Sequence, residues 1–235
     1  MSELAKRVLT AVVGIPLFLL ALVGPPPTLL PEGSAWVAIV MLIALLGSVE
    51  MLSAIESRYP QVRVNRLLAM LSVYLPFDAW LSAQQQVSFL SAARLTAVGA
   101  VLMAFTWEVW QAERRRVLSV WQNAGAGSLI GLYLGLLLSA WVQLRLVNAG
   151  CAQPGAWLSD GVRLVLLACV STWACDTTAY FVGRRFGQRR MASLLSPRKS
   201  WEGAGTGLVG GMAAAAVFCA PLGVPVSSAL VIGAA

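Results

Sequence analysis

The chain has no histidine and few charged residues, and both shortages narrow its chemistry. Among its 235 residues, 11% are charged and 58% are hydrophobic, whereas an ordinary globular protein has about 25% charged and about 45–50% apolar residues. A water-soluble fold of this size cannot bury so much apolar surface, so the composition predicts an integral membrane protein. It excludes a disordered chain, a disulfide-rich scaffold and a basic domain that binds nucleic acid.

The scarce residue types also remove several kinds of site. Without histidine, residues 1–235 hold no histidine metal ligand, general base or proton relay. The two lysines are Lys6 and Lys199. The four cysteines have no CxxC spacing, and three of them lie in apolar segments. We therefore expect small buried thiols, and neither a zinc site nor a redox pair.

Long apolar runs predict seven membrane spans and part of an eighth. A spanning helix needs about 20 mostly apolar residues. We expect an all-α, polytopic transmembrane helix bundle that forms one integral membrane domain over 1–235, with N-terminal spans over 8–142 and a core over 158–220. The expected spans are residues 8–30, 36–55, 67–81, 87–107, 125–142, 162–182 and 203–220, followed by the partial span 224–235.

Basic residues lie on alternate connections between these spans. Of the 17 lysines and arginines, 14 precede the first span or lie in the second, fourth and sixth connections. Arg145 is the one basic residue in the other connections. Because basic loops stay on the cytoplasmic side, the N-terminus and the basic connections are expected in the cytoplasm.

Two rows of glycines predict close helix packing. Glycine recurs every four residues at 127, 131 and 135, and again at 203, 207 and 211. Such a row forms a groove in which the backbone of another helix can approach. The rows favour a compact bundle over a set of loosely associated anchors.

Asp176 places a carboxylate inside an otherwise apolar span. Thr172, Asp176 and Tyr180 are spaced i, i+4, i+8 and share one helix face. Asp176 precedes the first arginine of the next loop by roughly 12 Å of helical rise. It could pair with an arginine to fix helix packing, or it could bind a metal or orient a polar substrate. The polar strip favours the second interpretation, since ionisable groups inside a membrane are costly and mostly functional.

The connection after Asp176 carries six basic residues and one acid. Its first part, residues 184–190, is equally well explained by attraction to anionic lipid headgroups. The second part, residues 196–203, places Pro197, Arg198 and Lys199 just before a glycine-rich helix. The N-terminus of a helix attracts anions, so Arg198 and Lys199 are candidates for a phosphate or pyrophosphate clamp.

Two stretches resemble the core of the phosphatidate cytidylyltransferases, the bacterial CDP-diacylglycerol synthases. Residues 176–187 read DTTAYFVGRRFG and residues 196–203 read SPRKSWEG. They are similar to the family patterns D-[ST]-G-A-Y-x-x-G-[RK]-x-F-G and S-P-[KG]-K-[ST]-W-E-G. Thr178 departs from the first pattern, which has glycine there. Glu50, at the cytoplasmic end of the second expected span, resembles a family glutamate more weakly.

The resemblance implies an enzyme of the bacterial cytoplasmic membrane that joins CTP to phosphatidic acid, giving CDP-diacylglycerol and pyrophosphate. It implies Mg²⁺ as cofactor, Asp176 as a catalytic residue and metal ligand, and Lys199 as a second catalytic residue. Monomer and homodimer both stay open. The implied substrate-binding residues are Tyr180, Arg184, Ser196, Arg198, Ser200 and Glu202. Of these, Ser196, Ser200 and Glu202 either shape the loop or reach polar parts of the nucleotide.

The sequence also leaves alternatives to this interpretation open. The family's diagnostic signature, with S-x-x-K-R, K-D and P-G-H-G-G-x-x-D-R-x-D, does not occur in residues 1–235. We expect that the natural chain continues or that this one is truncated, and that residues 1–235 alone do not turn over CTP. The alternatives are a truncated inactive relative, another CTP-dependent membrane lipid enzyme such as a polyprenol kinase, and a transporter or lipid-binding protein without catalysis.

The expected orientation can be tested by cysteine labelling in intact cells. After removal of the four native cysteines, Arg189→Cys should not react with a membrane-impermeant reagent added outside, because connection 183–202 is expected in the cytoplasm. The same cysteine should react once the membrane is permeabilised. Labelling from outside in intact cells would show that the topology is wrong.

Overall fold

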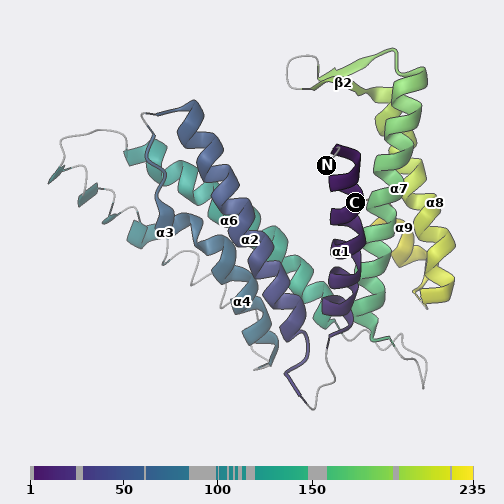
Figure 1. Ribbon diagram of the computed structural model, residues 1–235, viewed down its shortest axis with the longest axis horizontal. Helices are drawn as coiled ribbons and strands as arrows, with labels where there is room; N and C mark the ends of the chain where they lie inside the picture. Colours follow the sequence, from purple (N-terminus) through teal and green to yellow (C-terminus); the bar gives the residue numbers. More distant parts are fainter. Residues whose placement is uncertain are drawn as a thin grey trace. The chain divides into compact units, whose positions relative to one another are not determined.

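Helices make up most of the structure, a computed structural model in which two compact units are resolved (Figure 1). Unit 1 is Met1–Leu146 and unit 2 is Val147–Ala235. The structure describes residues 3–24, 29–60, 62–84, 120–147, 158–192, 196–222 and 224–234, and the shorter pieces 99, 101–104, 106, 107, 109, 110, 113 and 114.

Unit 1 is built around three helices that pack on one another. Helix α4 packs against both α6 and α2, and α1 contacts α2. The expected span 67–81 forms two helices, because a short helix, α3, ends at Ala69 and α4 begins at Leu71. The elements are α1 (Glu3–Val23), α2 (Ser34–Arg58), α3 (Arg66–Ala69), α4 (Leu71–Gln84) and α6 (Val120–Leu146).

The first glycine row brings α6 against α3 and α4. A Cβ atom added to Gly127 would lie 2.6 Å from the Asn65 carbonyl oxygen, and one added to Gly135 would lie 2.8 Å from the Leu71 carbonyl oxygen. At Gly131 an added Cβ would overlap the Leu68 carbonyl oxygen. The predicted close packing is therefore confirmed, since no larger side chain fits at these three positions.

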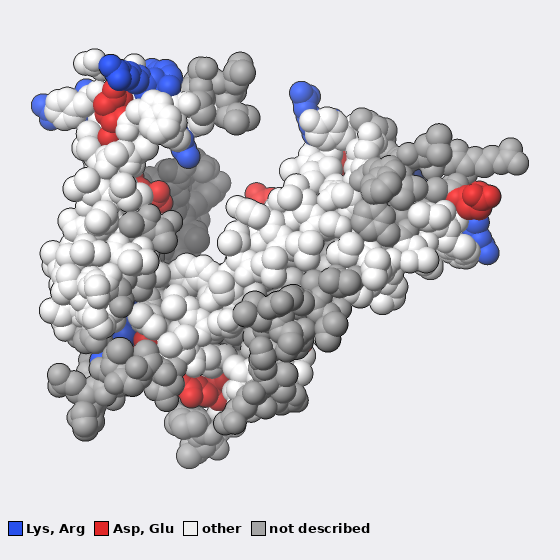
Figure 2. All heavy atoms as spheres, turned by 180° about the vertical axis from the view of Figure 1, so that it is seen from behind, with Lys and Arg blue, Asp and Glu red and all other residues white. Residues whose placement is uncertain are grey.

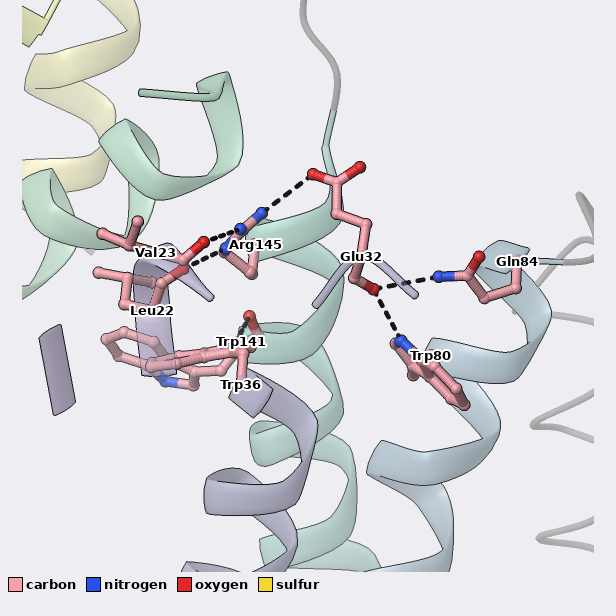
Figure 3. Close-up of polar contacts among 8 residues, drawn as sticks. All are labelled: Leu22, Val23, Glu32, Trp36, Trp80, Gln84, Trp141 and Arg145. Carbon is pink, nitrogen blue, oxygen red and sulfur yellow. Dashed lines mark hydrogen bonds and ion pairs between the residues drawn. The ribbon is translucent and has the colours of Figure 1, made fainter. Parts of the chain in front are cut away.

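Arg145 joins several parts of unit 1 through its buried guanidinium group (Figure 3). Its Nε donates to the Leu22 carbonyl oxygen at 2.6 Å, and Nη2 donates to the Val23 carbonyl oxygen at 3.2 Å. Its Nη1 pairs with the Glu32 carboxylate at 3.3 Å. The guanidinium thus satisfies carbonyl groups at the C-terminal end of α1, where positive charge is favourable. This explains the one basic residue on an expected outer connection.

The same region is held by two tryptophans and a glutamine (Figure 3). The Glu32 carbonyl oxygen accepts hydrogen bonds from Trp80 Nε1 at 2.9 Å and from Gln84 Nε2 at 3.1 Å. Trp36 Nε1 donates to the Trp141 carbonyl oxygen at 3.2 Å. Together with Arg145, these bonds connect α1, α2, α4 and α6 at one end of the unit.

Unit 2 is a helix pair with a short hairpin at one end. Helix α7 packs along α8, and α9 packs on both helices. The hairpin adds two strands to an otherwise helical chain, in the segment expected to be a loop. The elements are α7 (Asp160–Phe186), β1 (Arg190–Ala192), β2 (Ser196–Ser200), α8 (Trp201–Leu222) and α9 (Val226–Ala234).

The second glycine row forms the contact between α7 and α8. A Cβ added to Gly203 would lie 3.0 Å from the Ala179 carbonyl oxygen, and one added to Gly207 would lie 3.2 Å from the Cys175 carbonyl oxygen. At Gly211 it would lie 2.7 Å from the Gly233 carbonyl oxygen of α9. This prediction of close packing is also confirmed. Small residues on α7 meet small residues on α8, so the two backbones approach closely.

The structure confirms a multi-pass helical membrane protein but not the full number of spans. Four of its described helical segments are long and apolar enough to cross a membrane, and they match the expected second, fifth, sixth and seventh spans. In α1, the apolar segment Val12–Val23 is shorter. Most of the expected fourth span, 87–107, lies outside the described residues. The four segments are Ser34–Arg58, Gln122–Leu146, Asp160–Phe186 and Trp201–Ala220.

The cysteines fit the expected role only in part. Cys169 and Cys219 are buried free thiols, while Cys175 is half-buried against α8. Cys151 lies outside the described residues.

Two alanine substitutions in α6 test whether the first glycine row sets helix packing. Gly131→Ala should lower the thermal unfolding temperature in detergent, because overpacking at a backbone contact costs about 1–3 kcal/mol. Gly125→Ala is the matched control, since an added Cβ there meets nothing within 4 Å. The control should keep or slightly raise stability, because alanine favours a helix over glycine by about 1 kcal/mol. Equal unfolding temperatures for both variants would contradict the packing role.

Candidate functional site

The predicted polar strip lies on one exposed face of α7. Thr172, Asp176 and Tyr180 are all exposed within unit 2. The neighbouring positions Cys175 and Ala179 face α8 and close that side of the helix. The strip therefore lies next to the packed face of α7 and is not buried by the contact between α7 and α8.

No ion pair neutralises Asp176 within the part of the chain that the structure describes. The interpretation in which an arginine pairs with it to fix helix packing gains no support there. Thr172 donates its hydroxyl to the Ala168 carbonyl oxygen at 2.8 Å, inside its own helix. Asp176 is thus the one charged residue among Thr172, Asp176 and Tyr180, and its side chain is exposed.

Tyr180 and Arg184 extend the strip to the end of α7. Arg184 Nη1 lies 2.9 Å from the Tyr180 hydroxyl oxygen and donates a hydrogen bond to it. Its guanidinium carbon lies 6.0 Å from the centre of the Tyr180 ring. The structure therefore brings together two residues that were predicted separately to bind substrate, with the cation held over an aromatic side chain.

The departure from the family pattern at Thr178 is compensated on α8. The Thr178 side chain fills the space beside Gly210, where an added Cβ would overlap it. Its hydroxyl donates to the Ala174 carbonyl oxygen at 2.8 Å and thus needs no partner outside α7. A residue with a branched side chain therefore fits where a smaller one was expected, because the facing residue is glycine.

Ser200 is a structural residue at the junction of the hairpin and α8. Its buried hydroxyl accepts a hydrogen bond from the Gly203 backbone N–H at 3.2 Å, which caps the first turn of α8. A Cβ added to Gly187 would lie 2.5 Å from the Ser200 hydroxyl oxygen. Ser200 therefore shapes the loop, which is one of the two roles that the resemblance implied.

Glu202 faces the turn between α7 and β1. Its Oε2 accepts hydrogen bonds from the backbone N–H groups of Gln188 and Arg189, both at 3.2 Å. Trp201 N–H donates to the Arg189 carbonyl oxygen at 3.0 Å. The sequence placed Glu202 near the cations, but it held no signal that the partners would be backbone groups 13 and 14 residues earlier.

Basic side chains gather at the hairpin end of unit 2 (Figure 2). Strand β1 pairs antiparallel with β2, and Arg190 lies opposite Ser200 in the register. Lys199 is exposed on β2, next to the buried Ser200. Ser196 is half-buried at the start of β2, and the side chain of Arg198 lies outside the described part. The exposed cations are Arg184, Arg185, Arg189, Arg190 and Lys199.

In the described part of unit 2, α7 offers Mg²⁺ one exposed carboxylate, so other ligands would have to complete a site there. Among the described residues, no group of three or more cysteine, aspartate or glutamate side chains is placed to bind a metal. Mg²⁺ keeps several waters and is commonly bound through one or two carboxylates together with substrate phosphates. The exposed Asp176 carboxylate fits that pattern as one ligand, and it lies about two helical turns before the exposed Arg184.

Comparison with known proteins gives consistent matches over most of the chain. The sequence profile described as "Cytidylyltransferase family" matches residues 5–234. The chain is 26% identical over 223 residues to a phosphatidate cytidylyltransferase of Bacillus subtilis, covering 93% of this chain and 72% of the relative. It is 32% identical over 213 residues to that of Pseudomonas aeruginosa, covering 87% of this chain and 66% of the relative. No solved structure matches.

A shorter match has higher identity. The chain is 45% identical over 58 residues to a phosphatidate cytidylyltransferase of Haemophilus influenzae, covering 25% of this chain and 20% of the relative.

Loss of the Ser200 cap should loosen the hairpin end of unit 2. Ser200→Ala removes the hydrogen bond to the α8 N-terminus, which should cost about 1 kcal/mol of stability. The control is Ser53→Ala, an exposed serine that bonds only within α2. Thermal unfolding in detergent should show a lower midpoint for Ser200→Ala alone. Identical midpoints would mean that Ser200 does not support the fold.

Proposed function

We propose that this chain, which belongs to the cytidylyltransferase family, transfers a cytidylyl group from CTP to phosphatidic acid. The products are CDP-diacylglycerol and pyrophosphate. The relatives that carry the name phosphatidate cytidylyltransferase support the choice of phosphatidic acid as acceptor.

One observation carries the proposal: the polar strip on α7 ends beside the cationic hairpin. Asp176, Tyr180 and Arg184 lie along the last three turns of α7, and the exposed Lys199 follows on β2. The strip belongs to a helix long and apolar enough to span the membrane. A lipid phosphate could therefore reach this surface while its acyl chains stay in the bilayer, and a nucleotide could approach from water.

In the proposed reaction, an oxygen of the lipid phosphate attacks the α-phosphorus of CTP. A new P–O bond forms to the lipid phosphate, the bond to the β-phosphate oxygen breaks, and pyrophosphate leaves. No covalent nucleophile is required from the protein, so its contribution is positioning and charge stabilisation.

Each residue of the site has a proposed part in that positioning. Lys199 and Arg198 hold phosphate groups of the nucleotide, as compact and planar cations respectively. Arg184, steadied by Tyr180, orients the lipid phosphate. When bound, Mg²⁺ would neutralise the developing negative charge, with Asp176 as its protein ligand. Ser196, at the start of β2, contacts polar parts of the nucleotide in this proposal.

We further propose the membrane arrangement that the sequence predicted. Residues 1–235 then contain seven spans and part of an eighth in the bacterial cytoplasmic membrane, and the N-terminus is cytoplasmic. The hairpin end of unit 2 then faces the cytoplasm, where CTP is present.

Removal of the Asp176 charge tests the proposal. In membranes from cells that express the entire gene encoding this chain, labelled CTP, phosphatidic acid and Mg²⁺ should yield CDP-diacylglycerol. Asp176→Asn should reduce this synthesis about 100-fold or more, because asparagine keeps the size but loses the charge that attracts the metal. The amount of protein in the membrane should stay close to that of the wild type.

Controls separate catalysis from folding and from other acceptors. Glu56→Gln removes a carboxylate charge from α2 and should leave the rate unchanged. Full activity of Asp176→Asn at saturating Mg²⁺ would show that the carboxylate is structural. Use of a polyprenol acceptor in place of phosphatidic acid by the wild-type protein would point to a different CTP-dependent lipid enzyme.

A further inference from the structure

Glu202 is the one acidic residue among residues 183–203, and its carboxylate is occupied by the protein itself. Oε2 accepts from the backbone N–H groups of Gln188 and Arg189, and Oε1 also accepts from Arg189 N–H, each at 3.2 Å. A carboxylate that lies in the middle of a cationic surface is expected to approach an arginine or lysine side chain. In the described part of the chain, the Glu202 oxygens accept hydrogen bonds from N–H groups of the turn, and the Arg189 side chain acts on the carboxylate only through its charge.

These two N–H groups come from a short segment that neither helix nor sheet satisfies. Helix α7 ends at Phe186, and Gly187 N–H donates to the Gly183 carbonyl oxygen as the last bond of the helix. The register of the hairpin begins only at Arg190, which lies opposite Ser200. The N–H groups of residues 188 and 189 lie between the end of the helix and the start of the hairpin, and Glu202 supplies their acceptors.

The backbone of Arg189 is held to α8 on both of its polar groups. Its N–H donates to Glu202, and its carbonyl oxygen accepts from Trp201 N–H at 3.0 Å. Both partners lie in the first turn of α8. The first turn of α8 packs closely on α7, because a Cβ atom added to Gly203 would lie 3.1 Å from the Gly183 Cα atom. The packing of α7 on α8 therefore sets the position of the turn 187–190, and Glu202 makes the connection.

We infer that Glu202 is a positioning residue that holds the cationic turn 187–190 in place for anionic substrates, and that it is neither a metal ligand nor a contact to the nucleotide. The part of this inference that concerns substrates rests on the proposed function. The part that concerns the turn does not. Because one carboxylate oxygen accepts from both N–H groups, a single side chain can order the turn.

Two substitutions separate positioning from charge. Glu202→Gln removes the negative charge but keeps a side-chain oxygen that can accept from the same N–H groups. Glu202→Ala removes both. If only charge mattered, each variant would bind anions better than the wild type, since each loses one negative group beside the cations. If Glu202 ligated Mg²⁺, each would bind worse and need more Mg²⁺. Positioning alone predicts that the two variants differ.

The first measurement is independent of any activity. In the purified, detergent-solubilised protein, amide hydrogen exchange of the peptide covering 187–190 should be about 10-fold faster in Glu202→Ala, because the Gln188 and Arg189 N–H groups lose their acceptor. Trypsin cleavage after Arg189 and Arg190 should accelerate in the same variant. Glu202→Gln should stay close to the wild type in both measurements, and Glu56→Ala is the control for loss of a carboxylate elsewhere.

The second measurement uses CTP turnover with phosphatidic acid by the product of the entire gene that encodes this chain. Glu202→Ala should raise the KM for CTP about 10-fold by the same reasoning, with a smaller change in kcat. The Mg²⁺ concentration for half-maximal rate should not move, and Glu202→Gln should restore the wild-type KM. If Glu202→Ala does not fold, Glu202→Asp, which keeps the charge but is one methylene shorter, should show the same faster exchange.

The outcomes distinguish the two claims. Exchange in Glu202→Ala as slow as in the wild type would overturn the inference, and so would a Glu202→Gln variant as impaired as Glu202→Ala with an increased need for Mg²⁺. If the wild-type protein turns over no CTP but exchange separates alanine from glutamine, the proposed function fails and the role of Glu202 in the turn stands.

Discussion

The close approach of α7 and α8 is the constraint on which the candidate site depends. In a membrane, the lipid tails are as apolar as the helix surfaces, so burial of apolar area does not drive two helices together. Small residues permit the contact instead: Cys175, Ala179 and Gly183 on α7 meet Gly203 and Gly207 on α8. The same contact brings the end of one helix to the start of the other, and the hairpin connects them.

This packing also explains why two polar residues of the motif turn inward. Ser200 caps α8 and fills the space left by Gly187, so its hydroxyl is buried. Glu202 holds the turn through backbone N–H groups. A surface of several cations repels itself, and a flexible loop would spread them. A loop that is fixed at both ends keeps the cations together at one place.

In unit 1, one buried cation supplies hydrogen bonds to the end of a helix. Helix α1 ends at Val23, and the last carbonyl groups of a helix have no partner within the helix itself. Arg145 supplies donors to Leu22 and Val23, and Glu32 balances its charge. In the sequence, Arg145 is only an exception to the distribution of positive charge. In the structure, Arg145 connects α6 to the end of α1 and to Glu32.

The sequence by itself determined the class of protein, the positions of four long apolar helices, both glycine rows and the motif that relates the chain to its family. These follow from composition and from spacing along one helix, which are local properties of the chain. Only the tertiary structure decided that Glu202 binds backbone groups, that Arg145 closes the end of α1, and that Gly210 accommodates Thr178. Each of these depends on which groups meet across elements far apart in the sequence, and no local pattern records such a meeting.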